Sequence, residues 1–145
     1  HTIWVPANAM TPTASNGCSI LTTVETTSGR PDMNVLDFDK DSDEFAQFSV
    51  AFPKSWNAGT ITFQFFWSGI AATAVVVQDD AQGAVEELLV SAESGAVTIA
   101  GSPGDNELCY FRIGRDVSDG NDDMAGDCRL HGVKLFYTTD ASNDA

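Results

Sequence analysis

Large apolar side chains occupy every second position along much of the chain. The clearest case is residues 60–67 (TITFQFFW), where the odd-numbered positions are Ile, Phe, Phe and Trp and positions 60, 62 and 64 are polar. Successive side chains of a β-strand point to opposite faces of the sheet, whereas a helical period would scatter these residues around an axis. The pattern therefore predicts a strand with one apolar face.

The same alternation predicts further strands along the chain. Residues 45–52 (FAQFSVAF) alternate just as clearly and end at Pro53, and turn-forming stretches such as SGRP and KSWNAG separate neighbouring strands. The remaining predicted strands cover residues 3–5, 18–26, 33–38, 71–78, 96–100, 107–115 and 129–138.

One helix is expected, over residues 81–90. Ala84, Val85, Leu88 and Leu89 follow the i, i+3, i+4 spacing of a helical face, and the Asp pair at 79–80 can cap the first turn.

These elements predict an all-β fold. Eight or nine strands with one apolar face each must bury that face on another layer, so we expect a jelly-roll-like antiparallel β-sandwich with at most this one short helix. A chain of 145 residues fits one domain, residues 1–145. Within it, residues 1–16 are expected to be a short contact segment and residues 139–145 a polar tail.

The charge of the chain narrows its partners. Asp and Glu number 21 against 7 Lys and Arg, which gives a net charge of −14. Nucleic-acid binding needs a basic surface, and anionic membranes attract basic segments, so we expect neither partner. No apolar run reaches the roughly 18 residues of a membrane span.

Residues 37–45 (DFDKDSDEF) are the strongest candidate for a metal site. Asp39, Asp41 and Asp43 have the alternating spacing with which a calcium loop supplies carboxylate oxygens. Glu44 and Val50 stand where an EF-hand would need Gly and Glu, so an EF-hand is excluded. The two interpretations that stay open are a loop-type Ca²⁺ site and a solvated turn between two strands.

A second acidic stretch, residues 116–127 (DVSDGNDDMAGD), has mainly the chemistry of turns. A shared cation would gain support if both acidic loops met at one end of the sandwich.

Residues suited to catalysis are few. His131 lies within a predicted strand, where a structural role is the commoner one, and no known catalytic motif is present. We therefore expect no enzymatic activity. Cys18, Cys109 and Cys128 lack metal or redox spacing, which favours three buried free thiols over a Cys109–Cys128 pair.

Trp56 is the candidate ligand-binding residue. It lies in the KSWNAG connection, where an exposed indole could stack on a host-surface glycan or could instead cover the end of the sandwich. Trp67 belongs to an apolar strand face and is expected in the core.

Several stretches in order resemble a family of small structural proteins from tailed bacteriophages and prophages of marine and other proteobacteria. The resemblance covers most of the chain, with residues 69–95 matching less well. The stretches are TIWVPANAMTP, ETTSGRPDMNVLDFD, EFAQFSVAFPKSWNAGTITFQFFW, YFRIGRDVSD and RLHGVKLFYTTDASNDA.

The resemblance implies a virion component, either a capsid decoration protein or part of a tail, fibre or spike. It also implies assembly in the host cytoplasm and contacts with other virion proteins. A homo-oligomer is expected, with Ile3, Trp4, Val5 and Met10 as candidate contact residues. Two alternatives stay open: a carbohydrate-binding module that uses Trp56, and an extracellular filament subunit that associates through an exposed edge strand.

Overall fold

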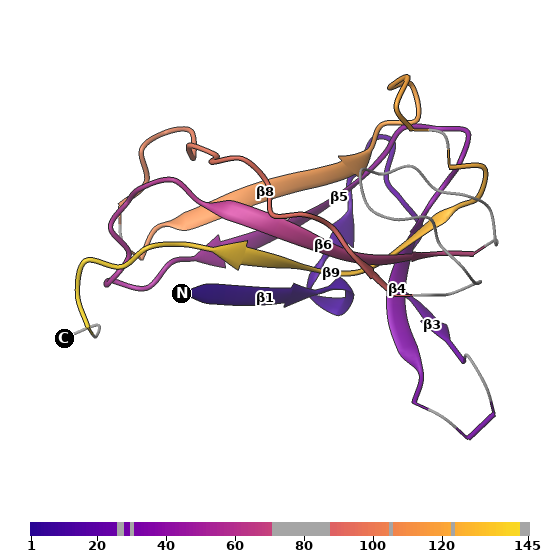
Figure 1. Ribbon diagram of the computed structural model, residues 1–145, viewed down its shortest axis with the longest axis horizontal. Coiled ribbons are helices and arrows are strands. Elements are labelled where there is room, and N and C mark those ends of the chain that lie inside the picture. Colours follow the sequence, from indigo (N-terminus) through magenta and orange to yellow (C-terminus); the bar gives the residue numbers. More distant parts are fainter. Residues whose placement is uncertain (26–27, 30, 71–87, 105, 123, 143–145) are drawn as a thin grey trace.

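Two antiparallel sheets form the structure, a computed structural model that describes residues 1–25, 28–29, 31–70, 88–104, 106–122 and 124–142 (Figure 1). A short 3₁₀ turn, η1 (Ala7–Ala9), follows the first strand. The strands are β1 (Thr2–Pro6), β2 (Thr11–Pro12), β3 (Thr22–Val24), β4 (Met33–Phe38), β5 (Glu44–Ala51), β6 (Thr62–Gly69), β7 (Leu89–Val90), β8 (Leu108–Arg115) and β9 (Cys128–Phe136).

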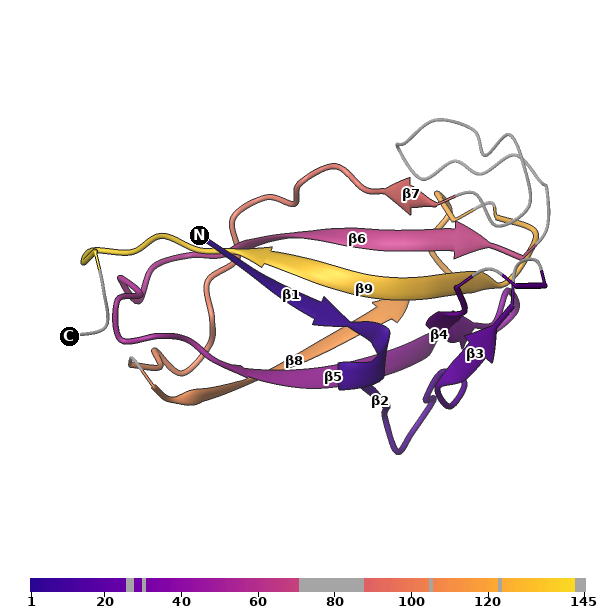
Figure 2. The same cartoon turned by 90° about the horizontal axis from the view of Figure 1, so that it is seen from below.

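Strand β9 is the centre of the larger sheet. The order of that sheet is β3-β4-β9-β6-β7, and β1 also pairs with β9. Strand β6 lies along one edge of β9, while β4 and β1 share the other edge, against residues 128–130 and 132–136 respectively. The smaller sheet has the order β2-β5-β8 and packs against the larger one (Figure 2). The chain passes between the sheets at several connections, among them β4–β5, β5–β6, β7–β8 and β8–β9. The two antiparallel sheets confirm the predicted all-β sandwich.

The core lies between the two sheets. The residues that are almost completely shielded from solvent include Phe52, Leu36, Leu135, Val35 and Val133. Burial of each such side chain contributes about 1.5–3 kcal/mol to folding, so this layer is the main source of stability.

The odd-numbered side chains of residues 60–67 form one apolar face that packs against the interior, as the alternation predicts. Ile61 and Trp67 are buried, and Phe63 and Phe65 pack half-buried against the core. In β9, by contrast, simple alternation fails, because the register shifts opposite Phe66 and leaves residue 131 without a cross-strand partner. This β-bulge keeps an even-numbered residue before it, Leu130, and odd-numbered residues after it on the same inner face.

Some predicted elements are corrected. Residues 18–21 are not in a strand, and only Thr22–Val24 pairs, with β4. Residues 96–100 contribute only one isolated bridge, between Ile61 and Val97. The predicted strand at 71–78 and residues 81–87 of the predicted helix lie outside the described residues.

The end of the predicted helix is a strand instead. Leu89 and Val90 form β7 against Trp67 and Phe66. The next residues continue along the edge of β6, since the backbone N–H groups of 91 and 94 donate to carbonyls of that strand. Pairing with an open sheet edge thus outweighs the helical spacing of this segment. Within the described residues, no helix has the length and apolar character needed to cross a membrane.

Candidate functional site

The N-terminal segment is part of the sandwich. Strand β1 pairs with β9 over its whole length, which turns Ile3 and Val5 toward the core. Val5 and Met10 are buried, and Ile3 is half-buried. Val5 and Met10 therefore pack within their own chain and leave little surface for a neighbouring subunit, while a contact through Ile3 stays a prediction. Trp4 differs, since it points away from the core and is 48% exposed.

Trp4 lies in the middle of an ordered outer surface on the larger sheet. The ladder places Trp4, Lys134 and Gln64 in one cross-strand row. The neighbouring rows are Pro6, Gly132 and Phe66 on one side and Thr2, Phe136 and Thr62 on the other. We name this surface the Trp4 face and define it by Trp4, Gln64, Phe66, Lys134 and Phe136.

The indole of Trp4 is held from two directions. Gly132 lies beneath it so closely that a Cβ atom at that position would collide with the ring. Phe66 meets the indole edge-on, with 5.0 Å between ring centroids and an interplanar angle of 84°. This T-shaped geometry is a favourable one for aromatic pairs. The ring is therefore fixed in orientation while about half of its surface stays in water. The roles of Gly132 and Phe66 depend on cross-strand register, so nothing in the sequence marks these two residues.

The rest of the Trp4 face is mixed in character. Lys134 places its Nζ 5.3 Å from the centre of the Phe136 ring, a cation–π distance. Gln64 donates from its side-chain amide to the carbonyl of Ser91 at 3.1 Å. The surface thus combines a half-exposed aromatic anchor with a positive charge, on a chain whose net charge is −14.

The two acidic loops do meet at one end of the sandwich. The backbone N–H of Lys40 donates to Asp127 Oδ1 at 3.0 Å, and that of Ser118 donates to Asp43 Oδ1 at 3.3 Å. Strands β4, β5, β8 and β9 all begin or end here, which brings residues 37–45 and 116–127 together.

Arg115, at the end of β8, joins these loops. Its Nε and Nη2 donate to the two carboxylate oxygens of Asp122 at 2.8 and 3.0 Å. Its Nη1 and Nη2 also donate to the carbonyls of Gly126 and Met124, both at 2.8 Å. Burial by itself would lower the pKa of Arg115, but the hydrogen bond and charge of Asp122 outweigh it and raise that pKa. The hydrogen bond from Arg115 in turn lowers the pKa of Asp122. The arginine therefore supplies a fixed positive charge between the acidic loops.

The three aspartates proposed for calcium each have a separate partner. Asp39 accepts from the backbone N–H of Asp41 at 2.6 Å, Asp41 pairs with the ammonium of Lys40, and Asp43 accepts from Ser118. Among the residues that the structure describes, no three His, Cys, Asp or Glu side chains are grouped so as to hold a metal ion. This arrangement favours the structured turn over the Ca²⁺ site, and calcium binding stays a prediction.

Trp56 is buried, which agrees with the interpretation that its indole covers the end of the sandwich and opposes the alternative of an exposed stacking residue. Only 3% of it is exposed, and it stacks on Phe52 with 4.5 Å between ring centroids. The connection folds inward because Trp56 bridges to Thr139 and the N–H of Asp140 donates to the carbonyl of Ser55. These bonds also attach the start of the predicted polar tail to the sandwich.

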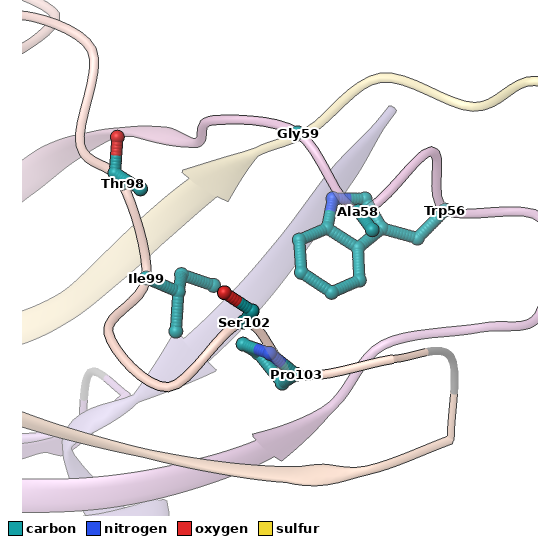
Figure 3. A pocket seen from close by; sticks show the side chains of 7 residues that line it. All are labelled: Trp56, Ala58, Gly59, Thr98, Ile99, Ser102 and Pro103. Atoms are coloured by element: carbon teal, nitrogen blue, oxygen red, sulfur yellow. The ribbon is translucent and has the colours of Figure 1, made fainter.

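A small pocket lies beside Trp56. Figure 3 shows its lining, with Trp56, Ala58 and Gly59 from one connection and Thr98, Ile99, Ser102 and Pro103 from another. Its volume is about 120 Å³, below the roughly 300–1,000 Å³ of typical small-molecule sites. Since Trp56 is almost completely buried and stacks on Phe52, a sugar ring has no open aromatic face here on which to stack.

His131 and the cysteines have structural surroundings. His131 Nε2 lies 2.9 Å from the hydroxyl of Ser68, which is fully buried, and burial together with the charge of Arg129 lowers the pKa of the imidazole. All three cysteines are free, as the sequence favoured, and the structure contains no Cys109–Cys128 pair. Burial raises the pKa of Cys18 to about 11 and that of Cys128 to about 12.

No protein-family model matches the chain, and no curated protein matches it.

Proposed function

We propose that the chain is a non-enzymatic structural component of a bacteriophage particle, either a capsid decoration protein or part of a tail, fibre or spike. It acts on the particle surface through contacts with other virion proteins and is assembled in the host cytoplasm before release. The ordered sequence resemblance supports the class of protein, and the Trp4 face supports the mode of action.

The exposure of Trp4 is the observation that carries this proposal. Tryptophan is among the residues that contribute most to protein–protein binding, because its large rigid ring is buried at little entropic cost. Trp4 is 48% exposed, and Phe66 and Gly132 already fix its ring. A partner that covers the Trp4 face therefore gains apolar contact without ordering the side chain first.

Trp56 is poorly suited to the alternative function of glycan binding, because its burial and the small size of the adjacent pocket both oppose stacking on a sugar. A glycan-binding role would have to use Trp4 instead. A glycan array separates the two functions: glycan binding by the wild-type chain that Trp4→Ala abolishes would replace our proposal.

Incorporation into particles tests the proposed function directly. Phage particles carrying wild-type, Trp4→Ala or Ile20→Ala chains are purified on a density gradient, and the chain is quantified against the major capsid protein. Ile20 is the matched control because it is 79% exposed and lies outside the Trp4 face. We expect stoichiometric wild-type and Ile20→Ala chain and strongly reduced Trp4→Ala chain. Absence of the wild-type chain from purified particles would refute the proposal.

A further inference from the structure

Strand β8 is an unusually long open edge. In the part of the chain that the structure describes, the other sheet-edge strands are short: β2 and β7 have two residues each and β3 has three. Strand β1, with five residues, ends at Pro6. Strand β8 has eight residues and, among the described residues, pairs with β5 alone; it lies toward the top of the molecule in Figure 1. Proteins usually keep free edges short because an open edge pairs with other strands.

The edge of β8 is also regular. Its pairing with β5 runs without a register shift from Leu108 to Arg115, and no proline interrupts it. In a strand with one antiparallel neighbour, about half of the backbone N–H and C=O groups point to the free side. No backbone hydrogen bond among the described residues joins residues 108–115 to any segment except β5. As far as the described residues show, the hydrogen-bonding groups on the free side of β8 are therefore available for another strand.

The exposed apolar side chains of β8 favour the addition of another strand at this edge. On the outer face Tyr110 is 78% exposed and Leu108 is 53% exposed. On the inner face Phe111 and Ile113 pack against the core and yet stay only partly buried, although the same face of β5 is buried. An added strand would shield apolar groups on both faces.

We propose that two copies of this chain pair antiparallel along β8, with Phe111 opposite Phe111, so that their two smaller sheets form one continuous sheet. The register follows from geometry. Opposed residues must lie on the same face, so the symmetric centre falls on a residue. Centring on Phe111 places Tyr110 opposite Arg112 of the second copy and Leu108 opposite Gly114.

The neighbouring registers are poorer. Centring on Arg112 would set two arginines directly opposite each other, which is destabilising. Centring on Tyr110 would place residues 113–115 opposite residues 105–107, beyond the start of the strand at Leu108. In the chosen register Leu108 of the second copy meets Phe45, whose ring covers Gly114.

The local charge of this edge is compatible with a second copy. The chain carries −14, so two copies repel each other across most orientations. Strand β8 contains no acidic residue and carries the exposed Arg112, while the charge of its other basic residue, Arg115, is paired with Asp122. The inference is independent of the virion proposal, because it concerns self-association alone.

Cysteine cross-linking tests the register. Tyr110→Cys and Arg112→Cys chains are mixed under mild oxidation at physiological salt, which screens the net repulsion. Opposed residues lie within disulfide reach, whereas the diagonal pairs formed by either variant alone are about 7–8 Å apart. We expect at least about tenfold more covalent dimer in the mixture than with either variant alone. Gln47→Cys is the matched control, since Gln47 is exposed on the same face but lies on β5. Equal cross-linking by Gln47→Cys would overturn the inference.

Sedimentation provides the second test. The wild-type chain is expected to dimerise as its concentration rises into the millimolar range, and Arg112→Glu is expected to weaken dimerisation about tenfold, because two Tyr–Arg pairs are lost per dimer. Adding Tyr110→Lys to Arg112→Glu places opposite charges across the interface and should restore association. A wild-type chain that remains monomeric throughout, or a double variant no better than Arg112→Glu, would overturn the inference. If the chain is present in phage particles but only as a monomer, the pairing along β8 is refuted and the virion proposal is unaffected.

Discussion

The indole of Trp4 lies directly over Gly132 on the neighbouring strand, and the absence of a side chain at Gly132 is what permits this contact. A Cβ atom at position 132 would meet the Trp4 ring and would come within 2.8 Å of the carbonyl oxygen of Val5. The position of Trp4 on the exposed face of the larger sheet thus depends on Gly132, which has no side chain.

Gly132→Ala should therefore destabilise the chain by about 1–3 kcal/mol, the usual range for an overpacked site. Urea unfolding followed by tryptophan fluorescence measures the free energy of unfolding. Gly95→Ala is the control, because a Cβ atom there meets nothing within 4 Å. Equal stability of the two variants would show that Trp4 moves aside without cost.

Arg115 should be the most important charged residue for stability. The Arg115 and Asp122 side chains are only 10% and 18% exposed, so Arg115→Met removes the charged partner of the Asp122 carboxylate and the side-chain donor of two carbonyls. Removing one partner of a buried ion pair costs about 3–5 kcal/mol. Arg112→Met is the matched control, since Arg112 is exposed and contacts mainly the Phe45 ring, and it should cost less than about 1 kcal/mol. Similar losses in the two variants, measured by urea unfolding, would contradict this role.

Calcium should leave the stability of the chain unchanged. The carboxylates of Asp39, Asp41 and Asp43 each have a separate partner within the protein and do not point to a common position. The folded chain therefore offers Ca²⁺ no preformed site at these residues. We expect the same thermal midpoint with added CaCl₂ as with EDTA. A midpoint that rises with CaCl₂ and returns with chelator would instead restore the calcium site predicted from the sequence.

His131 should make the chain less stable in mild acid. Burial, reinforced by the charge of Arg129, holds the pKa of His131 below its ordinary value of 6.5. As the pH falls below about 6.5, the unfolded chain takes up a proton that the folded chain resists, so the free energy of unfolding falls. His131→Gln should flatten this part of the pH profile between pH 7 and 5. An unchanged slope in His131→Gln would assign the effect to other groups.

The three thiols should react slowly in the native chain. Burial raises the pKa of Cys109 as well as those of Cys18 and Cys128, and only the thiolate is reactive. At pH 8 we expect labelling by a thiol reagent to be about 100-fold slower than in urea. Ser15→Cys, at an exposed position, should add one fast-reacting thiol. Fast labelling of the wild-type chain would contradict the buried positions.

The fold class followed from the sequence because alternation is a local property. Each side chain in residues 60–67 turns to the opposite face from its neighbour, so the apolar side of the strand can be read without any knowledge of its partners. The bulge in β9 was not predictable in the same way, since an extra residue is defined only against the opposing strand.

The candidate site depended on contacts between distant segments. The sequence showed three tryptophans and two acidic loops, but it left open whether Trp56 is exposed or covers the end of the sandwich, and it gave no special place to Trp4 among its apolar neighbours. Bridging between residue 139 and the connection at Trp56 buried one indole, while pairing of β1 with β9 over Gly132 exposed the other. Local pattern therefore determined the fold class and the apolar faces of the regular strands, but not the bounds of every strand. Cross-strand register and loop packing, which join residues far apart in the chain, decided which aromatic rings reach the solvent and which edge stays open.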